Sequence, residues 1–209
     1  WQAEVAVAAG VTTVLIANGL TDVDAARRFG ALLADDANLR ILCWADSVDT
    51  IELLGAARID DARPLDVLVE LGGLGGRTGA RTVSEGEEIA RVIASTPGLR
   101  LAGVTGYEGP FGPDRSETSV AAVDAYLATL VELHSRLDYP DGIRPVVSAG
   151  GSSFPDRAAA MLAPLGSGEV DVVLRSGAFQ IHDDGFYSRM SPFGPITGTS
   201  PLRSAMHAW

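Results

Sequence analysis

The chain has 209 residues, of which 46% are hydrophobic and 21% are charged, and its 16 cationic residues are all arginines. Because lysine is absent, this chain cannot itself supply a lysine Schiff base, a P-loop lysine or a lysine base. The net charge of −11 argues against a nucleic-acid partner, since proteins that bind a phosphate backbone present a basic surface. The length suits one large α/β domain or two small ones.

The chain opens on an amphipathic pattern that predicts a helix over Gln2–Ala9. The uncharged run from Val5 to Thr21 is interpreted as helix, turn and strand, and it falls short of a membrane span. No secretory signal is recognisable. The single cysteine, Cys43, fits a reducing compartment. We therefore expect a cytoplasmic protein with no membrane partner.

Short, nearly all-apolar runs alternate with amphipathic segments along the rest of the chain, which is typical of parallel strands covered on both faces. Strands are predicted at Thr13–Asn18, Leu39–Ala45, Leu65–Leu71, Leu99–Gly106, Arg144–Ala149 and Val170–Arg175. Helices are predicted at Thr21–Ala34, Ser47–Ala57, Ser84–Ser95, Thr118–Leu137 and Pro155–Leu162. Thr21, Ser47 and Ser84 stand at N-cap positions, and Glu87 would complete a capping box with Ser84.

This βα alternation favours a barrel or an open doubly wound sheet. A closed (β/α)8 barrel has eight strands, so a barrel would need two more than the six predicted, most simply before Trp1. Both ends of the chain look cut. Residues 1–187 are expected to form a partial barrel. Residues 188–209, which are rich in Pro, Gly and Ser, are expected to connect it to a further domain.

In either architecture, the functional residues lie in the loops that follow the carboxyl ends of the strands. The loop 72–79 is rich in glycine and carries Arg77, whose rigid guanidinium can bind an anionic oxygen or a ring nitrogen. The alternative is a flexible loop with a solvated arginine. Tyr107 opens a long loop after the next strand and could stack on a planar ligand, or be a half-buried aromatic residue.

Two later loops have the composition of an anion site. Gly150, Gly151, Ser152 and Ser153 lie between a strand and a helix, where backbone amides and hydroxyls can bind phosphate, although many such turns bind nothing. In a barrel the turns after the last two strands are neighbours, so Ser176 and Gly177 could complete this cradle.

The histidines are weaker signals. His134 lies on the apolar stripe of a predicted helix and is expected to be a packed helix residue. His182 stands beside Asp183 and Asp184, but one histidine with adjacent acids does not make a metal site. His207 carries no information. No metal ligands are therefore assigned in this chain.

Taken in order, four segments resemble one family: Val69–Leu71 with Arg77–Gly79, then Gly103–Gly109, Val147–Ser153 and Leu174–Phe179. They resemble the D-threonine aldolase and D-serine dehydratase-like group, also described as amino-acid deaminases or alanine-racemase N-terminal-domain proteins. This resemblance implies a pyridoxal-phosphate (PLP) enzyme with an alanine-racemase-type barrel, which acts on a small amino-acid substrate and is a homodimer at full length.

The resemblance also implies roles for individual residues. Arg77 matches the arginine that reaches the pyridoxal ring, and Tyr107 matches a tyrosine beside the cofactor. The phosphate cradle is matched by Gly150, Gly151, Ser152 and Ser153, with Ser176 and Gly177 on the facing loop. The chain departs from the family at Gly72, where Asp is common, and at Phe179, where Tyr is common.

The family places its Schiff-base lysine on the first barrel strand, and no position of this chain matches it. Its divalent metal ligands lie in a C-terminal β domain that this chain also lacks. We therefore expect an inactive central fragment of a PLP-dependent lyase, rather than a degenerate member without catalysis, because a barrel short of two strands would expose unpaired edges. The alternatives are a racemase-like PLP enzyme, a non-catalytic PLP-binding barrel, and a barrel that holds a sugar phosphate at residues 150–153.

Overall fold

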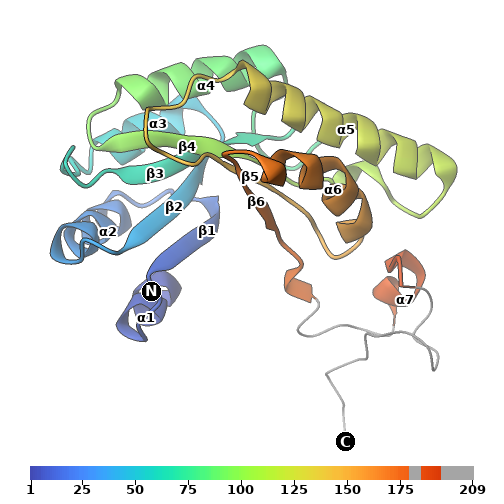
Figure 1. Cartoon of the computed structure of the whole chain (residues 1–209), viewed down its shortest axis with the longest axis horizontal. Coiled ribbons are helices and arrows are strands. Elements are labelled where there is room, and N and C mark those ends of the chain that lie inside the picture. Colours follow the sequence, from blue (N-terminus) through green and yellow to red (C-terminus); the bar gives the residue numbers. More distant parts are fainter. Residues whose placement is uncertain (179–184, 194–209) are drawn as a thin grey trace, which may run out of the picture.

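The computed structural model describes residues 1–178 and 185–193, which build a six-stranded parallel sheet flanked by helices (Figure 1). The strands are β1 Thr13–Gly19, β2 Arg40–Ala45, β3 Leu65–Leu71, β4 Leu99–Gly106, β5 Val146–Ala149 and β6 Asp171–Leu174. The α-helices are α1 Gln2–Ala8, α2 Val23–Asp35, α3 Val48–Gly55, α4 Val83–Ser95, α5 Glu117–Arg136, α6 Pro155–Leu162 and α7 Phe186–Met190. Each predicted strand and helix is therefore present.

The sheet is part of a barrel. Its strand order runs from β1 to β6 without reversal, whereas a doubly wound sheet reverses its order at a switch point. The sheet also curls strongly, because Arg40 Nη1 of β2 lies 3.9 Å from Asp171 Oδ2 of β6. A flat sheet would hold these two strands about 19 Å apart. The partial-barrel prediction is confirmed, and the open doubly wound sheet is not.

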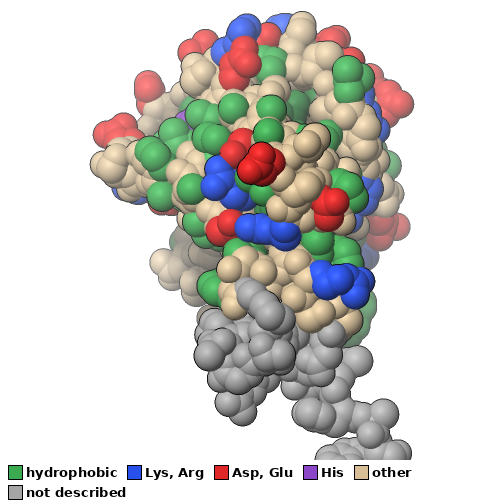
Figure 2. Space-filling view, turned by 90° about the vertical axis from the view of Figure 1, so that its right-hand side faces the viewer, with side chains coloured by type: hydrophobic (Ala, Val, Ile, Leu, Met, Phe, Trp, Pro, Cys, Tyr) green, Lys and Arg blue, Asp and Glu red, His purple; other side chains and the backbone are tan. Residues whose placement is uncertain are grey.

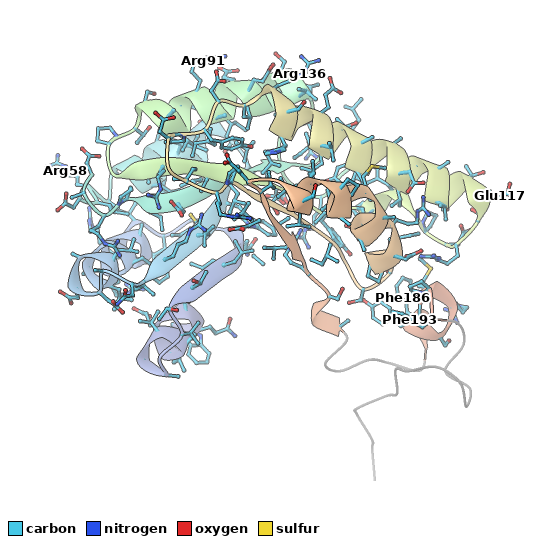
Figure 3. All side chains as sticks on the ribbon, viewed as in Figure 1. Arg58, Arg91, Glu117, Arg136, Phe186 and Phe193 are labelled. Carbon is cyan, nitrogen blue, oxygen red and sulfur yellow. The ribbon has the colours of Figure 1, made fainter. Side chains whose placement is uncertain are left out.

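Figure 1 shows the helices on the convex side of the sheet. The main hydrophobic core joins residues of these helices to residues of the strands. Leu127, Leu130 and Leu133 of α5 are fully buried there, at the spacing that the helical pattern of this segment requires. Glu117 and Arg136 lie at opposite ends of α5 (Figure 3), each with the charge that favours its end of the helix dipole.

A second cluster lies on the concave side of the sheet. Leu42, Trp44, Leu68 and Val146 are buried there and pack with partly buried Leu15 and Val173. Alternation along the strands explains both clusters, because neighbouring residues of a strand point to opposite faces. The concave side is therefore the barrel interior, and the edges β1 and β6 bound it.

An ionic cluster crosses the sheet at the amino ends of its strands. Asp66 of β3 is 1% exposed and accepts hydrogen bonds from Arg40 Nε at 2.7 Å and from Arg100 Nε at 2.6 Å. Arg144 Nε binds Asp171 on β6 at 2.9 Å. These contacts join β2, β3 and β4 across the end of the barrel that lies opposite the predicted functional loops.

Several element ends differ from their predicted positions. The N-cap of α2 is Asp22 rather than Thr21, and its side chain accepts from Asp24 N at 2.9 Å. The N-cap of α4 is Thr82 rather than Ser84, so the predicted capping box is wrong. Glu85 Oε2 instead accepts from Arg81 N at 2.6 Å. Asp22 is a stronger acceptor than Thr21, whereas Thr82 is not stronger than Ser84, so neighbouring cap residues cannot be ranked from sequence alone.

The last described segment is short. Helix α7 spans residue 187, which is the predicted end of the partial barrel. Met190, at the end of this helix, is buried in the main core. Phe186 and Phe193 flank this segment and are about half exposed (Figure 3). Most of the predicted connection lies outside the described residues, so the domain boundary stays a prediction. Among the described helices none is long and apolar enough to cross a membrane. On the face in Figure 2, acidic, basic and apolar side chains are interspersed.

His134 is a packed helix residue, as predicted. Its ring is half-buried near the end of α5, and its Nδ1 lies 2.8 Å from the hydroxyl of Tyr139. Burial lowers the pKa of His134 below its ordinary value of 6.5, because the charged ring loses hydration.

Acidification is expected to destabilise the wild-type chain more than a His134→Gln variant. A histidine whose pKa is lower in the folded state contributes stability above its unfolded pKa, and this contribution is lost as the pH falls through the folded pKa. Urea unfolding between about pH 7 and about pH 5 measures this, with the wild type showing the steeper fall in unfolding free energy. Parallel pH profiles for the two proteins would contradict the assignment.

Candidate cofactor site at the carboxyl ends of the strands

The glycine-rich loop after β3 is tightly packed. The amides of Gly72 and Gly73 both donate to Ala80 O, at 2.8 and 2.9 Å. A Cβ on Gly72 would lie 1.7 Å from Thr78 O, so this position excludes any side chain in the present loop conformation. The family aspartate at this position therefore requires a different loop path. Arg77 itself is exposed, so the alternative of a solvated arginine stays open.

Arg77 and Tyr107 are brought together from two loops. The Arg77 guanidinium lies 5.1 Å from the centre of the Tyr107 ring, in a cation–π contact. Tyr107 N donates to the hydroxyl of Tyr126 at 2.9 Å, which fixes the start of its loop. Burial raises the pKa of Tyr107, so the ring stays a neutral phenol at physiological pH.

The Gly150–Gly151 turn lies against the loop that begins at Tyr107. A Cβ on Gly151 would lie 2.6 Å from Tyr107 Cε2, so only glycine allows this approach. The amides of Gly150 and Gly151 both donate to the carboxylate of Glu108, at 3.0 and 2.6 Å. Arg77, Tyr107 and this turn therefore form one contiguous group.

The two loops after β5 and β6 are neighbours, as a barrel requires. Ser152 Oγ accepts from Ala178 N at 3.1 Å, which joins the serine turn to the loop that carries Ser176 and Gly177. Ser153 O accepts from Arg115 Nη1 at 2.9 Å. Within residues 1–178 and 185–193, the amides of Ser152 and Ser153 have no acceptor.

A polar row crosses the concave face just below these loops. Glu70, Thr105 and Ser148 are register partners on β3, β4 and β5. Glu70 Oε1 accepts from Thr78 Oγ1 at 2.6 Å, and Ser148 Oγ accepts from Arg175 Nε at 3.0 Å. The buried Thr105 hydroxyl has no protein partner among the described residues.

Arg175 lies over this row. Its Nη2 donates to Gly106 O, and its guanidinium lies 4.7 Å from the centre of the Trp44 ring. Burial lowers the pKa of Arg175, and the carboxylates of Glu108 and Glu70 counteract this shift. Burial likewise raises the pKa of Glu70 and of Glu108. The site therefore combines buried groups of both signs, which is typical of functional sites.

No protein-family profile matches the chain. The chain is 28% identical over 153 residues to 3-hydroxy-D-aspartate aldolase of Paracoccus denitrificans (strain Pd 1222), across 73% of this chain and 39% of that protein. A crystal structure of D-threonine aldolase from Filomicrobium marinum matches at a TM-score of 0.70 and 25% identity, over 98% of this chain and 52% of that chain. D-threo-3-hydroxyaspartate dehydratase from Delftia sp. HT23 matches at a TM-score of 0.62 and 22% identity, over 87% of this chain and 46% of that chain.

Alanine racemases share the fold at 16% and 17% identity. The chain therefore has the alanine-racemase fold and is similar to an aldolase and a dehydratase that share this fold. It spans about half the length of its structural relatives and 39% of the curated relative. These similarities confirm the resemblance expected from the four segments quoted above.

The predicted site residues lie at one end of the barrel. Arg77, Tyr107 and the Gly150–Ser153 turn are in mutual contact or adjacent, and the Ser176–Gly177 loop faces the turn. Their roles toward PLP stay predictions. Phe179 and the His182–Asp184 cluster lie outside the described residues, as does His207. No group of three potential metal ligands occurs in the described part of the chain.

Sequence reasoning did not single out the buried charges of this site: Glu70, Glu108 and Arg175. Two of the three had a detectable signal. Glu70 interrupts an otherwise apolar strand that is buried throughout, and Arg175 directly follows another strand. A charged residue at the carboxyl end of a buried strand either pairs inside the barrel or marks a functional site.

Proposed function

We propose that the chain supplies the cofactor-seating part of a PLP-dependent lyase that acts on β-hydroxy D-amino acids by aldol cleavage or dehydration. The observation that carries this proposal is the contact of Arg77, Tyr107 and the Gly150–Gly151 turn at the carboxyl end of the barrel. The likeness to 3-hydroxy-D-aspartate aldolase and D-threonine aldolase supports the reaction class.

The residues present fit PLP. The Tyr107 ring packs directly against Gly151, and the amides of Ser152 and Ser153 have no acceptor in the described structure. Unpaired amides with neighbouring hydroxyls suit a phosphate group. Below them, the buried Thr105 hydroxyl and Trp44 Nε1 have no partner among the described residues. These two groups on the concave face could therefore form hydrogen bonds with a ligand.

Each group of residues has a distinct task in this proposal. Ser152, Ser153 and the Ser176–Gly177 loop hold the phosphate. Tyr107 packs beside the pyridine ring, and Arg77 donates to a ring oxygen or nitrogen, where a permanently charged guanidinium holds the ring's protonation state. PLP, when bound, supplies the electron sink for charge that develops on the substrate.

Catalysis needs an amine that this chain does not contain. We infer that a lysine on a further strand, in the space between edges β1 and β6, completes the barrel and the active site. Within residues 1–178 and 185–193 the outer edges of β1 and β6 pair with no strand, and this supports the proposal because edge strands offer free backbone donors and acceptors. The substrate, the metal requirement and a homodimeric state of the completed protein belong to the same proposal.

PLP titration of the 209-residue chain tests cofactor seating directly. We expect saturable, non-covalent binding, followed by PLP fluorescence, that inorganic phosphate competes away. The longer protein, with the lysine-bearing strand, is then expected to cleave or dehydrate D-threonine or 3-hydroxy-D-aspartate. Failure of the longer protein to bind PLP would refute the proposal. PLP binding by it without turnover on either substrate would support the non-catalytic PLP-binding barrel instead.

Arg77→Ala is expected to weaken PLP binding by about tenfold, because it removes a charged hydrogen bond to the ring. Arg91→Ala is the matched control, since Arg91 is an exposed arginine of α4 (Figure 3). Circular dichroism checks that both variants keep the fold. Equal PLP affinity of the Arg77→Ala and Arg91→Ala variants would contradict the role of Arg77.

A further inference from the structure

The side chain of Glu108 is a buried internal ligand of the Gly150–Gly151 turn. It is 0% exposed, its Oε2 accepts from Gly150 N at 3.0 Å, and its Oε1 accepts from Gly151 N at 2.6 Å. A buried carboxylate must be compensated by donors of this kind, and hydrogen bonds to a charged acceptor are the strong ones. Glu108 has no part in the cofactor contacts described above.

The two glycines are explained by this contact. Gly150 has φ +119°, and a Cβ there would lie 2.8 Å from Arg175 O. A Cβ on Gly151 would lie 2.6 Å from Tyr107 Cε2 and 3.4 Å from Glu108 Oε1. A side chain at Gly151 would push the turn away from Tyr107 and Glu108, and one at Gly150 would push it away from the backbone of Arg175. The glycine pair therefore serves the approach of this loop, and not only the approach of a ligand.

The contact also divides the turn into two halves. The amides of Gly150 and Gly151 are taken by the carboxylate, whereas those of Ser152 and Ser153 have no acceptor among the described residues. A phosphate group and a carboxylate repel each other strongly at close range in a buried site. A phosphate is therefore directed to the serine half of the turn.

We propose that Glu108 is a positioning residue that fixes the Gly150–Gly151 turn and directs the phosphate group of the cofactor to the amides of Ser152 and Ser153. The identity of that phosphate rests on the proposed function. The carboxylate acts through the turn and touches neither the cofactor nor the substrate.

The first test compares PLP with pyridoxal, which lacks the phosphate group. Glu108→Gln keeps one acceptor but places an amide donor against a backbone N–H, so the turn loses its fixed orientation. We expect PLP affinity to fall about tenfold and pyridoxal affinity to stay within about twofold of wild type. Equal losses for both ligands, or tighter PLP binding, would overturn the proposal.

Asp114→Asn is the matched control. Asp114 lies in the same loop and also accepts a backbone amide, from Ser116 N at 3.0 Å, but it supports Ser116, the N-cap of α5, and not the glycine turn. We expect the ratio of PLP to pyridoxal affinity to stay at the wild-type value in this variant. A fall in that ratio equal to that of Glu108→Gln would show a general effect of loop stability and would overturn the proposal.

A second measurement needs no variant and no activity. In a titration of the ¹⁵N-labelled wild-type chain with inorganic phosphate, the amide signals of Ser152 and Ser153 are expected to shift, and those of Gly150 and Gly151 to stay nearly unchanged. Larger shifts at the two glycines would mean that phosphate displaces Glu108, which overturns the proposal. If PLP does not bind but phosphate shifts the serine amides, the proposed function fails while this inference stands.

Discussion

Alanine in place of Asp66 is expected to lower the free energy of unfolding by about 3 kcal/mol. Asp66 is 1% exposed and is the shared acceptor for Arg40 and Arg100. Its removal leaves two guanidinium groups close together without their counter-charge, although both keep some contact with solvent, which moderates the loss. Urea unfolding followed by circular dichroism measures the effect.

Asp171→Ala is the control for this prediction. Asp171 binds Arg144 at the same end of the barrel but is 40% exposed. Exposed ion pairs contribute little, so we expect a loss below about 1 kcal/mol. If both variants lose the same stability, burial of Asp66 does not strengthen the ionic cluster and the interpretation given above is wrong.

Gly72→Ala is expected to cost about 3 kcal/mol and to move the loop that carries Arg77. The new Cβ would lie 1.7 Å from Thr78 O, and a backbone carbonyl cannot turn aside as a flexible side chain can. Because Thr78 also donates to Glu70, the displacement is expected to break that 2.6 Å hydrogen bond. Urea unfolding and the PLP titration report the two effects separately.

Gly75→Ala separates crowding from backbone strain. Gly75 lies in the same loop with φ +82°, but a Cβ there meets no atom within 4 Å. We expect it to cost about 1 kcal/mol, the price of a left-handed conformation for a residue other than glycine. An equal cost at Gly72 and Gly75 would show that strain, and not the contact with Thr78, governs the loop.

The strands could be predicted closely because apolar, β-branched runs are covered on both faces in a βα architecture. β3 and β4 have the predicted bounds, and β1 extends the predicted range by one residue. β5 begins at Val146, two residues later than predicted, since Pro145 has no amide to donate to the ladder. The curl of the sheet could not be predicted, because it depends on contacts such as that between Arg40 and Asp171.

The loops of the candidate site could be located for a similar reason. Glycine and serine after a buried strand indicate a βα turn, and parallel strands end at one edge of the sheet. The partners of Gly150 and Gly151 could not be predicted, because Glu108 lies 42 and 43 residues earlier in the chain. The backbone conformation of the loop 72–79 could not be predicted either. Its glycines allow many conformations, and only the packing of the folded protein selects one.

The Tyr107 ring has a consequence for how this site can change during evolution. It contacts the guanidinium of Arg77 on one loop and faces the bare backbone of Gly151 on another. A substitution in any of the three positions alters the surroundings of the other two, so their effects on binding will not add. Such epistasis allows the loops to diverge only together, and a family member with a different residue at position 107 is expected to differ in both neighbouring loops.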